Sequence, residues 1–333
     1  MGVGLTRRGW LSAVLAGAAG MACGRRSEGV VAEVGGEPRG AAGAGERTGG
    51  AGERTGGAGE RASGALGDPW GRRWRRLYFP ATASRAEAQR AEVLGVGVGD
   101  EPVLIALHGR GETRSLEAGA GSWRVDYEMG RGDARLRSPP LVAEDLKGFV
   151  RPARLEAINA ALRGTPYRGV RVVSPFTPDL IRAGASEAAG FASFLIEELL
   201  PAARGGGGRP ERTGIDGVSL GGRLSLLVGL SHPEIFGAVG AMQPAVRRSE
   251  VPAFVALAVA ASRVRAQVVR LVTSQEDPFR PVVHLLGEAL AQAGVAHAVQ
   301  ETPGPHDYAW NQGPGSVETL LWYDRVLRGE PGL

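Results

Sequence analysis

Short apolar, often β-branched runs alternate along this chain with longer segments in which apolar residues recur at helical spacing. The runs predict strands at residues 74–79, 103–107, 170–175, 213–218, 236–242, 268–273 and 298–302. The periodic segments predict helices at residues 187–203, 222–230, 282–293 and 317–327. Because strands that alternate with helices form a mostly parallel sheet with helices on both faces, the pattern predicts an α/β fold. Residues 111–169 are rich in Gly, Pro and Arg without a clear period, and we expect them to form part of a substrate pocket or a partial cap.

A serine stands between glycines where a predicted strand turns directly into a predicted helix, in the stretch 217–222. In a chain with 53 glycines such a motif is weak alone, so its position between strand and helix carries the argument. This order is typical of a nucleophile elbow, whose strained turn exposes the serine hydroxyl. The glycines are needed because a Cβ would collide with the neighbouring strand and helix. Ser219 is therefore the predicted nucleophile.

A serine hydroxyl needs a base to take its proton, and the base needs an acid to orient it. In chains with a nucleophile elbow these residues follow in the order Ser, Asp or Glu, His. The only aspartate between Ser219 and His306 is Asp277, in a loop that follows a predicted strand. Glu276 beside it is the substitute acid, and a turn-capping role for Asp277 is the alternative.

Five histidines can be sorted by their predicted positions. His306 follows a strand and a Pro-Gly-Pro turn and precedes the last helix, which suits a base at the carboxyl edge of the sheet. His232, His284 and His297 fall at a helix end, within a helix and at a strand start, so we expect structural roles for them. We likewise expect His108 to order its loop.

An oxyanion hole is expected from two backbone N–H groups. One belongs to the residue after the nucleophile, Leu220, and the other to Arg110 in the loop that follows residues 103–107. Four aromatic residues are candidates for a substrate pocket, with core packing as the alternative: Trp123, Tyr127, Tyr308 and Trp310.

Several of these segments resemble the putative-esterase family of α/β-hydrolases, which includes feruloyl, acetylxylan and siderophore esterases and S-formylglutathione hydrolase. The resemblance spans residues 70–327 and rests on four segments: Leu-His-Gly at 107–109, the elbow at 217–222, His-Pro-Glu-Ile-Phe at 232–236, and Gly-Pro-His-Asp-Tyr at 304–308. It implies the α/β-hydrolase fold and a serine carboxylester hydrolase with Ser219, Asp277 and His306 as its triad.

The first 23 residues have a basic start with adjacent arginines, then a short alanine-rich apolar stretch, which is typical of an export signal, in this case of the twin-arginine kind. The sole cysteine, Cys23, ends this segment. Two interpretations are open: Cys23 is the lipidated first residue of a lipoprotein, or cleavage follows Ala22 and the protein is secreted.

Residues 24–67 consist almost wholly of Gly, Ala, Glu, Arg and Thr and contain a seven-residue repeat at 44–50 and 51–57. This composition predicts a disordered tether, because it offers too little apolar surface to fold. The catalytic domain is predicted at residues 68–333. The excess of basic residues lies before residue 77 and the rest is near neutral, which argues against a nucleic-acid partner.

The sequence thus predicts an exported serine esterase of the cell envelope, acting through an acyl-enzyme on a small-molecule or polysaccharide-linked ester. No metal or organic cofactor is expected, and membrane contact is expected only through an N-terminal lipid. The alternatives are a serine peptidase similar to prolyl oligopeptidase and a non-catalytic binding module with the same fold. The sequence indicates neither the acyl and alcohol groups nor the oligomeric state.

Overall fold

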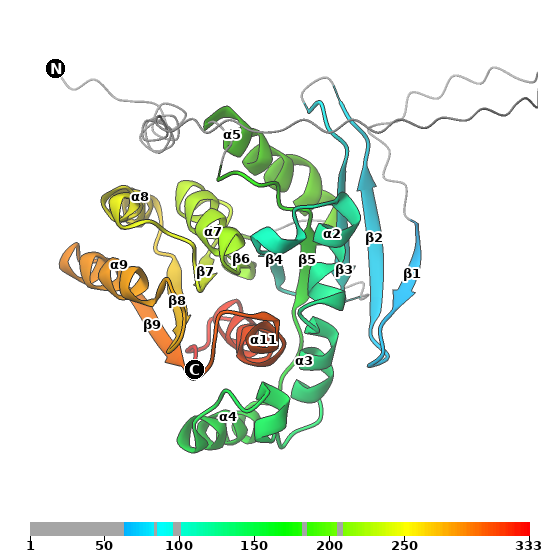
Figure 1. Cartoon of the computed structure of the whole chain (residues 1–333), viewed down its shortest axis with the longest axis vertical. Coiled ribbons are helices and arrows are strands. Elements are labelled where there is room, and N and C mark those ends of the chain that lie inside the picture. The colour runs from blue at the N-terminus through cyan, green and yellow to red at the C-terminus, as the bar shows by residue number, and fades with distance from the viewer. Residues whose placement is uncertain (1–62, 83–84, 96–100, 182–184, 205–208) are drawn as a thin grey trace, which may run out of the picture.

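The predicted alternation of strands and helices is present in the computed structural model (Figure 1). The structure describes residues 63–333 except 83–84, 96–100, 182–184 and 205–208. The predicted export signal, Cys23 and nearly all of the predicted tether lie outside the described residues. No helix in the described part of the chain is long and apolar enough to cross a membrane.

Nine strands form one sheet in the order β1-β2-β3-β5-β4-β6-β7-β8-β9. Strands β4 to β9 run parallel, whereas β1, β2 and β3 add to β5 as an antiparallel meander. The bounds are β1 Ser63–Gly67, β2 Arg73–Phe79, β3 Gln89–Leu94, β4 Val103–Leu107, β5 Arg171–Pro175, β6 Thr213–Gly217, β7 Ala238–Met242, β8 Val268–Ser274 and β9 His297–Thr302.

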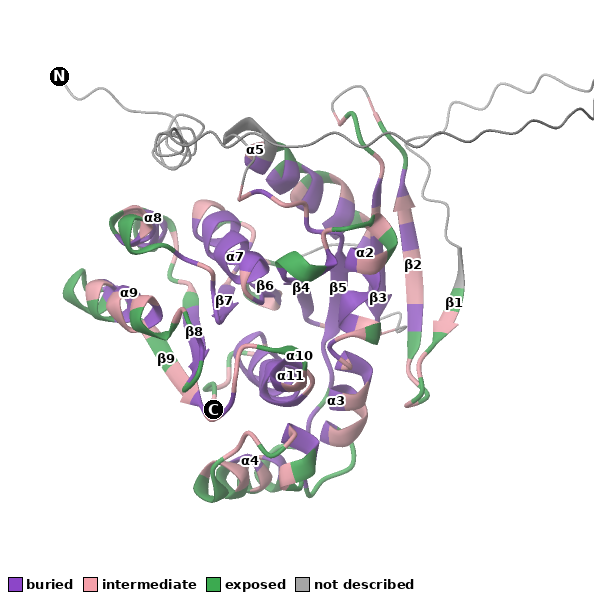
Figure 2. Ribbon diagram, in the orientation of Figure 1, coloured by how far each residue is buried: buried purple, intermediate pink, exposed green. Residues whose placement is uncertain are grey.

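Both faces of the sheet are covered, because successive side chains of a strand point to opposite sides. In β4, Ile105 and Leu107 belong to one core cluster and Leu104 and Ala106 to the other. The first cluster packs under α7, α8 and α9 and the helix that begins with α5, and the second packs under α2, α3 and α11. Helix α11 is buried along its whole length, whereas α4, α8 and α9 keep exposed outer faces (Figure 2).

The helices that cover the sheet include a π-helical stretch, Phe194–Leu199, between α5 and α6. Their bounds are α2 Leu116–Val125, α3 Met129–Leu136, α4 Pro152–Gly164, α5 Ala185–Ser193, α6 Leu200–Arg204, α7 Leu220–Ser231, α8 Val251–Val264, α9 Arg280–Gln292, α10 Tyr308–Trp310 and α11 Ser316–Val326.

Every predicted strand and helix overlaps an observed element, and five further elements or groups in the described residues were not predicted: β1, β3, α8, α10 and the helices α2 to α4. Strand β1 corrects the predicted boundary of the tether at residue 67. Its backbone pairs with β2, and Leu66 packs against the core, so the folded part of the chain includes residues 63–67. Backbone pairing needs no apolar run, which is why composition alone missed this strand.

Candidate active site

Ser219 stands in a sharp turn between β6 and α7 and is the N-cap of that helix. Its φ of 57° and ψ of −113° are strained for a residue with a side chain. The turn is held from three sides: the Ser219 N–H donates to Met242 O at 2.9 Å, and its carbonyl accepts the N–H groups of Arg223 and Ala245. The strained backbone is thus fixed by its surroundings, and the hydroxyl is presented at the carboxyl ends of the parallel strands.

The glycines around Ser219 have the steric role expected from the sequence. A Cβ on Gly221 would lie 2.4 Å from Leu107 O and 2.6 Å from His108 O. A Cβ on Gly217 would lie 2.4 Å from the carbonyl carbon of Gly221. These contacts are with backbone atoms that cannot rotate away, so only glycine lets β6, β4 and α7 approach this closely.

Asp277 and His306 meet at the same edge of the sheet, after β8 and β9 respectively. The Nδ1 atom of His306 lies 2.8 Å from Asp277 Oδ1. The Asp277 carboxylate is buried and also accepts hydrogen bonds from the Thr273 hydroxyl at 2.7 Å and the Phe279 N–H at 3.0 Å. The His306 side chain remains 22% exposed. A buried carboxylate that fixes a partly exposed imidazole through Nδ1 leaves Nε2 as the nitrogen available to accept a proton.

Gln243, the residue after β7, connects the elbow with the loop that carries His306. Its Nε2 donates to Pro305 O at 2.9 Å and to Ser274 Oγ at 2.7 Å, and its own backbone has a φ of 44°. Its N–H donates to Val272 O, and the preceding residue, Met242, accepts the Ser219 N–H. Within the described residues no hydrogen bond joins Ser219 Oγ to His306. The structure therefore brings Asp277 and His306 into contact and places Ser219 at their edge of the sheet.

Residues 108–112, here called the oxyanion loop after the role predicted for Arg110, follow β4 and lie against Ser219. A Cβ on Gly109 would be 3.8 Å from Ser219 Cβ. The Gly109 N–H donates to the Tyr127 hydroxyl at 3.1 Å. Within the described part of the chain, the N–H groups of Arg110 and Leu220 donate to no protein acceptor. The Leu220 N–H is also at the first turn of α7, where the helix dipole favours negative charge.

His108 is fully buried and orders the oxyanion loop. Its Nδ1 contacts Gly109 O at 2.7 Å, and its Nε2 accepts the Thr177 N–H at 2.8 Å. Burial lowers the pKa of His108 from 6.5 to about 4, and so it stays neutral. These contacts fit the expected structural role.

The predicted pocket residues separate by exposure. Trp123 has no exposed surface and packs edge-on against Tyr127 in the core, so its predicted pocket role is corrected to packing. Trp310 is also buried, and its indole N–H donates a hydrogen bond to the Thr302 hydroxyl. Tyr308 is 46% exposed and stays a candidate for contact with substrate. The sequence around Trp123 does not show that α2 turns this side chain toward the core.

Two residues near the site, Glu112 and Gln243, were not predicted from the sequence. Buried Glu112 accepts hydrogen bonds from Tyr127 and Tyr308, and Gln243 is described above. Neither belongs to a motif, although a carboxylate three residues beyond His-Gly was a visible signal. Of the two acids considered, Asp277 contacts His306. Exposed Glu276 donates its backbone N–H to Gly304 O, and within the described residues its side chain makes no hydrogen bond.

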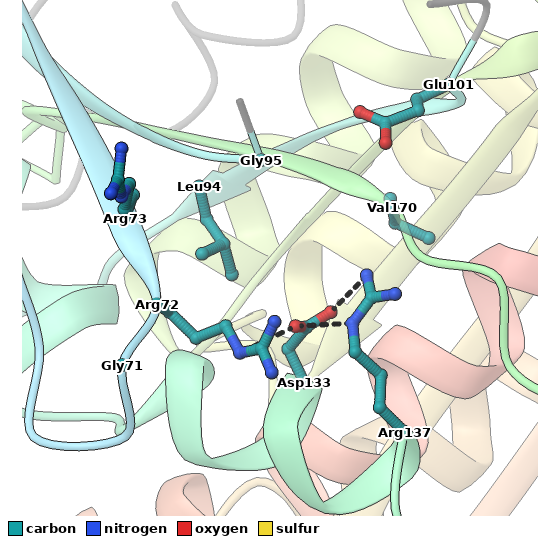
Figure 3. Close-up of a pocket in the computed structure, with 9 residues that line it drawn as sticks. All are labelled: Gly71, Arg72, Arg73, Leu94, Gly95, Glu101, Asp133, Arg137 and Val170. Carbon is teal, nitrogen blue, oxygen red and sulfur yellow. Dashed lines mark hydrogen bonds and ion pairs between the residues drawn. The ribbon is translucent and has the colours of Figure 1, made fainter. Parts of the chain in front are cut away.

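The described residues also form a cavity of about 310 Å³ between β2, β3 and α3, beside the start of β5 (Figure 3). Arg72 and Arg137 both turn toward Asp133 in this cavity, and Arg137 makes a two-bond contact with that carboxylate. Val170 places the cavity at the amino edge of the parallel strands, opposite Ser219. It is therefore separate from the candidate active site. In the described ranges no three His, Cys, Asp or Glu side chains are grouped so that they could hold a metal ion.

Comparison with known proteins connects this geometry with a class of enzyme. Residues 151–312, just under half of the chain, match the family model described as putative esterase, and this segment contains Ser219, Asp277 and His306. No curated protein sequence matches the chain.

Solved structures match over a larger share of the chain. A ferulic acid esterase is similar with a TM-score of 0.54 at 16% identity, over 77% of this chain and 98% of that one. The S-formylglutathione hydrolase FrmB from Staphylococcus aureus gives 0.53 at 12%, over 76% and 98%. Serine hydrolase F from the same bacterium, a fluorophosphonate-binding protein named FphF, gives 0.53 at 12%, over 76% and 99%. At such identities the likeness shows the fold, which is the α/β-hydrolase fold predicted from the sequence.

The family match and the fold together confirm the resemblance to the putative-esterase family of α/β-hydrolases. The protein is accordingly a carboxylic ester hydrolase by class.

Proposed function

We propose that the protein is a serine esterase in which Ser219, His306 and Asp277 form the catalytic triad. The observation that carries this proposal is the hydrogen bond between buried Asp277 and His306, at the same sheet edge as the strained Ser219 turn. A strained serine at the start of a helix, a histidine oriented by a carboxylate and free backbone N–H groups beside them are the parts that acyl transfer needs.

In the acylation step His306 Nε2 takes the proton of the Ser219 hydroxyl as Oγ attacks the ester carbonyl. Asp277 holds the ring and stabilises its positive charge. The N–H groups of Arg110 and Leu220 donate to the oxyanion of the tetrahedral intermediate. The imidazolium then gives its proton to the departing alcohol, which leaves Ser219 acylated.

Deacylation repeats these steps with water as the nucleophile. His306 takes a proton from water, the hydroxide adds to the acyl carbon, and the second intermediate collapses to release the acid. The proton held by His306 returns to Ser219 Oγ, so the enzyme ends in its starting state.

The first test is hydrolysis of a short-chain p-nitrophenyl ester by the full chain and by Ser219→Ala. We expect the variant to lose at least a thousandfold in kcat, because no other nucleophile stands at the elbow. A fluorophosphonate probe should label the wild-type serine and leave the variant unlabelled. Ester hydrolysis that survives in a folded Ser219→Ala protein would refute the triad.

Other outcomes separate the alternatives. Labelling of Ser219 without ester hydrolysis would direct the search to peptide substrates, since the same triad cleaves amides. A folded wild-type protein that is neither labelled nor active would indicate a binding module that keeps the fold.

For the substrate, we propose a small-molecule or polysaccharide-linked ester. A panel of feruloyl, acetylxylan and siderophore esters, compared by kcat/KM, covers this range. The exposed ring of Tyr308 beside the oxyanion loop supports including aromatic acyl groups.

We also propose that residues 1–23 direct export to the cell envelope and that residues 24–62 tether the catalytic domain. Mass spectrometry of the mature N-terminus distinguishes a lipidated Cys23 from cleavage after Ala22. Cys23→Ala should move a lipoprotein from the membrane fraction to the soluble fraction, and should change nothing in a secreted form.

A further inference from the structure

Glu112 is a buried carboxylate at the end of the oxyanion loop, and the triad mechanism does not use it. It is 2% exposed and accepts two short hydrogen bonds from tyrosine hydroxyls. Tyr127 donates to Oε2 at 2.6 Å, and Tyr308 donates to Oε1 at 2.5 Å. Burying a carboxylate is unfavourable unless such bonds compensate it, so the three side chains depend on one another.

On one side the network reaches the oxyanion loop. The Tyr127 hydroxyl, while donating to Glu112, accepts the Gly109 N–H at 3.1 Å. This bond sets the orientation of the Gly109 backbone, which lies against Ser219 and is followed directly by Arg110. The direction of the Arg110 N–H therefore depends on where Glu112 holds Tyr127.

On the other side the network reaches residues 303–307, here called the histidine loop. Tyr308 comes directly after that loop, at the start of α10, where the Asp307 side chain caps the helix by accepting the Trp310 N–H. A Cβ on Gly111 would lie 2.9 Å from the Tyr308 hydroxyl, so the oxyanion loop approaches Tyr308 closely. The rings of Tyr127 and Tyr308 also lie beside each other, with centroids 6.0 Å apart and ring planes tilted by 33°.

We propose that Glu112 is a positioning residue that holds the oxyanion loop and the histidine loop at a fixed distance from each other through Tyr127 and Tyr308. The proposal rests on the proposed triad, because it assigns Arg110 N–H and His306 to the same reaction. One carboxylate fixes the distance between the group that stabilises the oxyanion and the group that moves the proton. Errors of about 1 Å in such a distance lower rates by roughly a hundredfold.

Both tyrosines keep their protons over the working range of an esterase. Burial first, and then the charge of Glu112, raise the pKa of Tyr127 well above 10. The hydrogen bond to Glu112 is the main cause that raises the pKa of Tyr308 to about 12. The two hydroxyls therefore stay donors to Glu112.

The test compares Glu112→Gln, Tyr127→Phe and Tyr308→Phe in the full chain with a p-nitrophenyl ester and with a boronic acid. The boronic acid forms a tetrahedral adduct with the serine and uses the oxyanion hole, whereas substrate binding in the ground state does not. For Glu112→Gln and Tyr127→Phe we expect kcat and boronic acid affinity to fall together by about tenfold or more, with KM within about threefold of wild type. Tyr308→Phe should lower kcat more than boronic acid affinity, because it frees the histidine loop and leaves Gly109 bound.

Tyr167→Phe is the matched control. Tyr167 is a second buried tyrosine that donates to a buried carboxylate, Asp133, at 3.0 Å, near the amino edge of the sheet. Its loss should lower the free energy of unfolding and leave kcat and boronic acid affinity unchanged.

Wild-type kcat and boronic acid affinity in folded Glu112→Gln or Tyr127→Phe would overturn the proposal, as would equal losses in Tyr167→Phe or a change confined to KM. If Glu112→Gln does not fold, Tyr127→Phe decides by the same criteria. Failure of the proposed function gives a different result, namely activity or probe labelling that survives Ser219→Ala.

Discussion

Acidification should destabilise the protein through one buried histidine, His108. In the folded state its pKa is about 4, and in the unfolded chain about 6.5. Folding therefore favours the neutral ring, which accepts the Thr177 N–H through Nε2 and contacts Gly109 O through Nδ1. A protonated ring would carry a second donor facing the Thr177 N–H.

The sign and the size follow from linkage. A base whose pKa is lowered by folding contributes stability that is complete above its unfolded pKa and is lost as the pH falls toward its folded pKa. Between pH 7.5 and pH 5, proton binding to the unfolded chain lowers the free energy of unfolding by about 2 kcal/mol. The loss continues to about 3 kcal/mol near pH 4.

A second buried group acts in the opposite direction, so the wild-type curve alone cannot isolate this effect. Burial raises the pKa of Asp216, which precedes the elbow, from 3.8 to about 6. An acid whose pKa is raised by folding contributes stability below its unfolded pKa that is lost as the pH rises through its folded pKa. Acidification to pH 5 therefore adds about 1 kcal/mol through Asp216.

The assay is urea unfolding of wild type and His108→Gln at pH 7.5 and pH 5. Glutamine can accept the Thr177 N–H without titrating, and Asp216 is common to both proteins. We expect the change in unfolding free energy between the two pH values to differ by about 2 kcal/mol between the proteins. Parallel pH curves, or an NMR titration of His108 near pH 6.5 in the folded state, would refute the reasoning.

Three further predictions concern the elbow and its support. Gly221→Ala should abolish activity or folding, because its Cβ would meet two backbone oxygens. At the exposed position Gly190 in α5 a Cβ would meet nothing within 4 Å, so Gly190→Ala should raise the unfolding free energy by about 0.5–1 kcal/mol with unchanged kcat. Asp277→Asn should lower kcat by about 10³–10⁴-fold by disturbing the histidine tautomer, and an equal loss in Glu276→Gln would contradict the choice of acid. Gln243→Leu removes the side-chain bonds to Pro305 O and Ser274 Oγ and should lower the unfolding free energy by about 1–3 kcal/mol; chemical denaturation with no shift would show those bonds to be dispensable.

The elements that the sequence predicted correctly are those whose apolar pattern is dictated by burial. Strand β4 lies between two helix layers and is apolar at every position, whereas β5 and β8 each keep an apolar core, Val172–Val173 and Leu271–Val272, beside a buried arginine. The elbow could be predicted because its glycines are required by close contacts within the turn itself. The order of residues in the chain then pointed to Asp277 and His306.

The elements that were not predicted depend on contacts between distant parts of the chain, or have apolar residues without a clear period. Strand β3 includes Glu92, which is 1% exposed and is paired with Arg76 and Arg124, so a buried position is occupied by a charged residue. Helix α3 contains Gly132, which lets it approach α11 closely, and a glycine lowers helix propensity. Helix α8 is apolar over most of its length, which hides its period. Glu112 depends on partners distant in sequence, and only the folded chain shows them.

Strand direction determines where the two ends of the folded domain lie relative to catalysis. Because β1 is antiparallel to β2, β2 to β3 and β3 to β5, the chain enters β1 on the side where β4, β6 and β8 end. After α11 the chain is at the opposite side, where Arg328 contacts Gly169 before β5. If the protein is immobilised on a solid support through the N-terminal side of the domain, the support therefore adjoins the edge of the sheet that carries Ser219. Immobilisation through the C-terminal side leaves that edge facing solution.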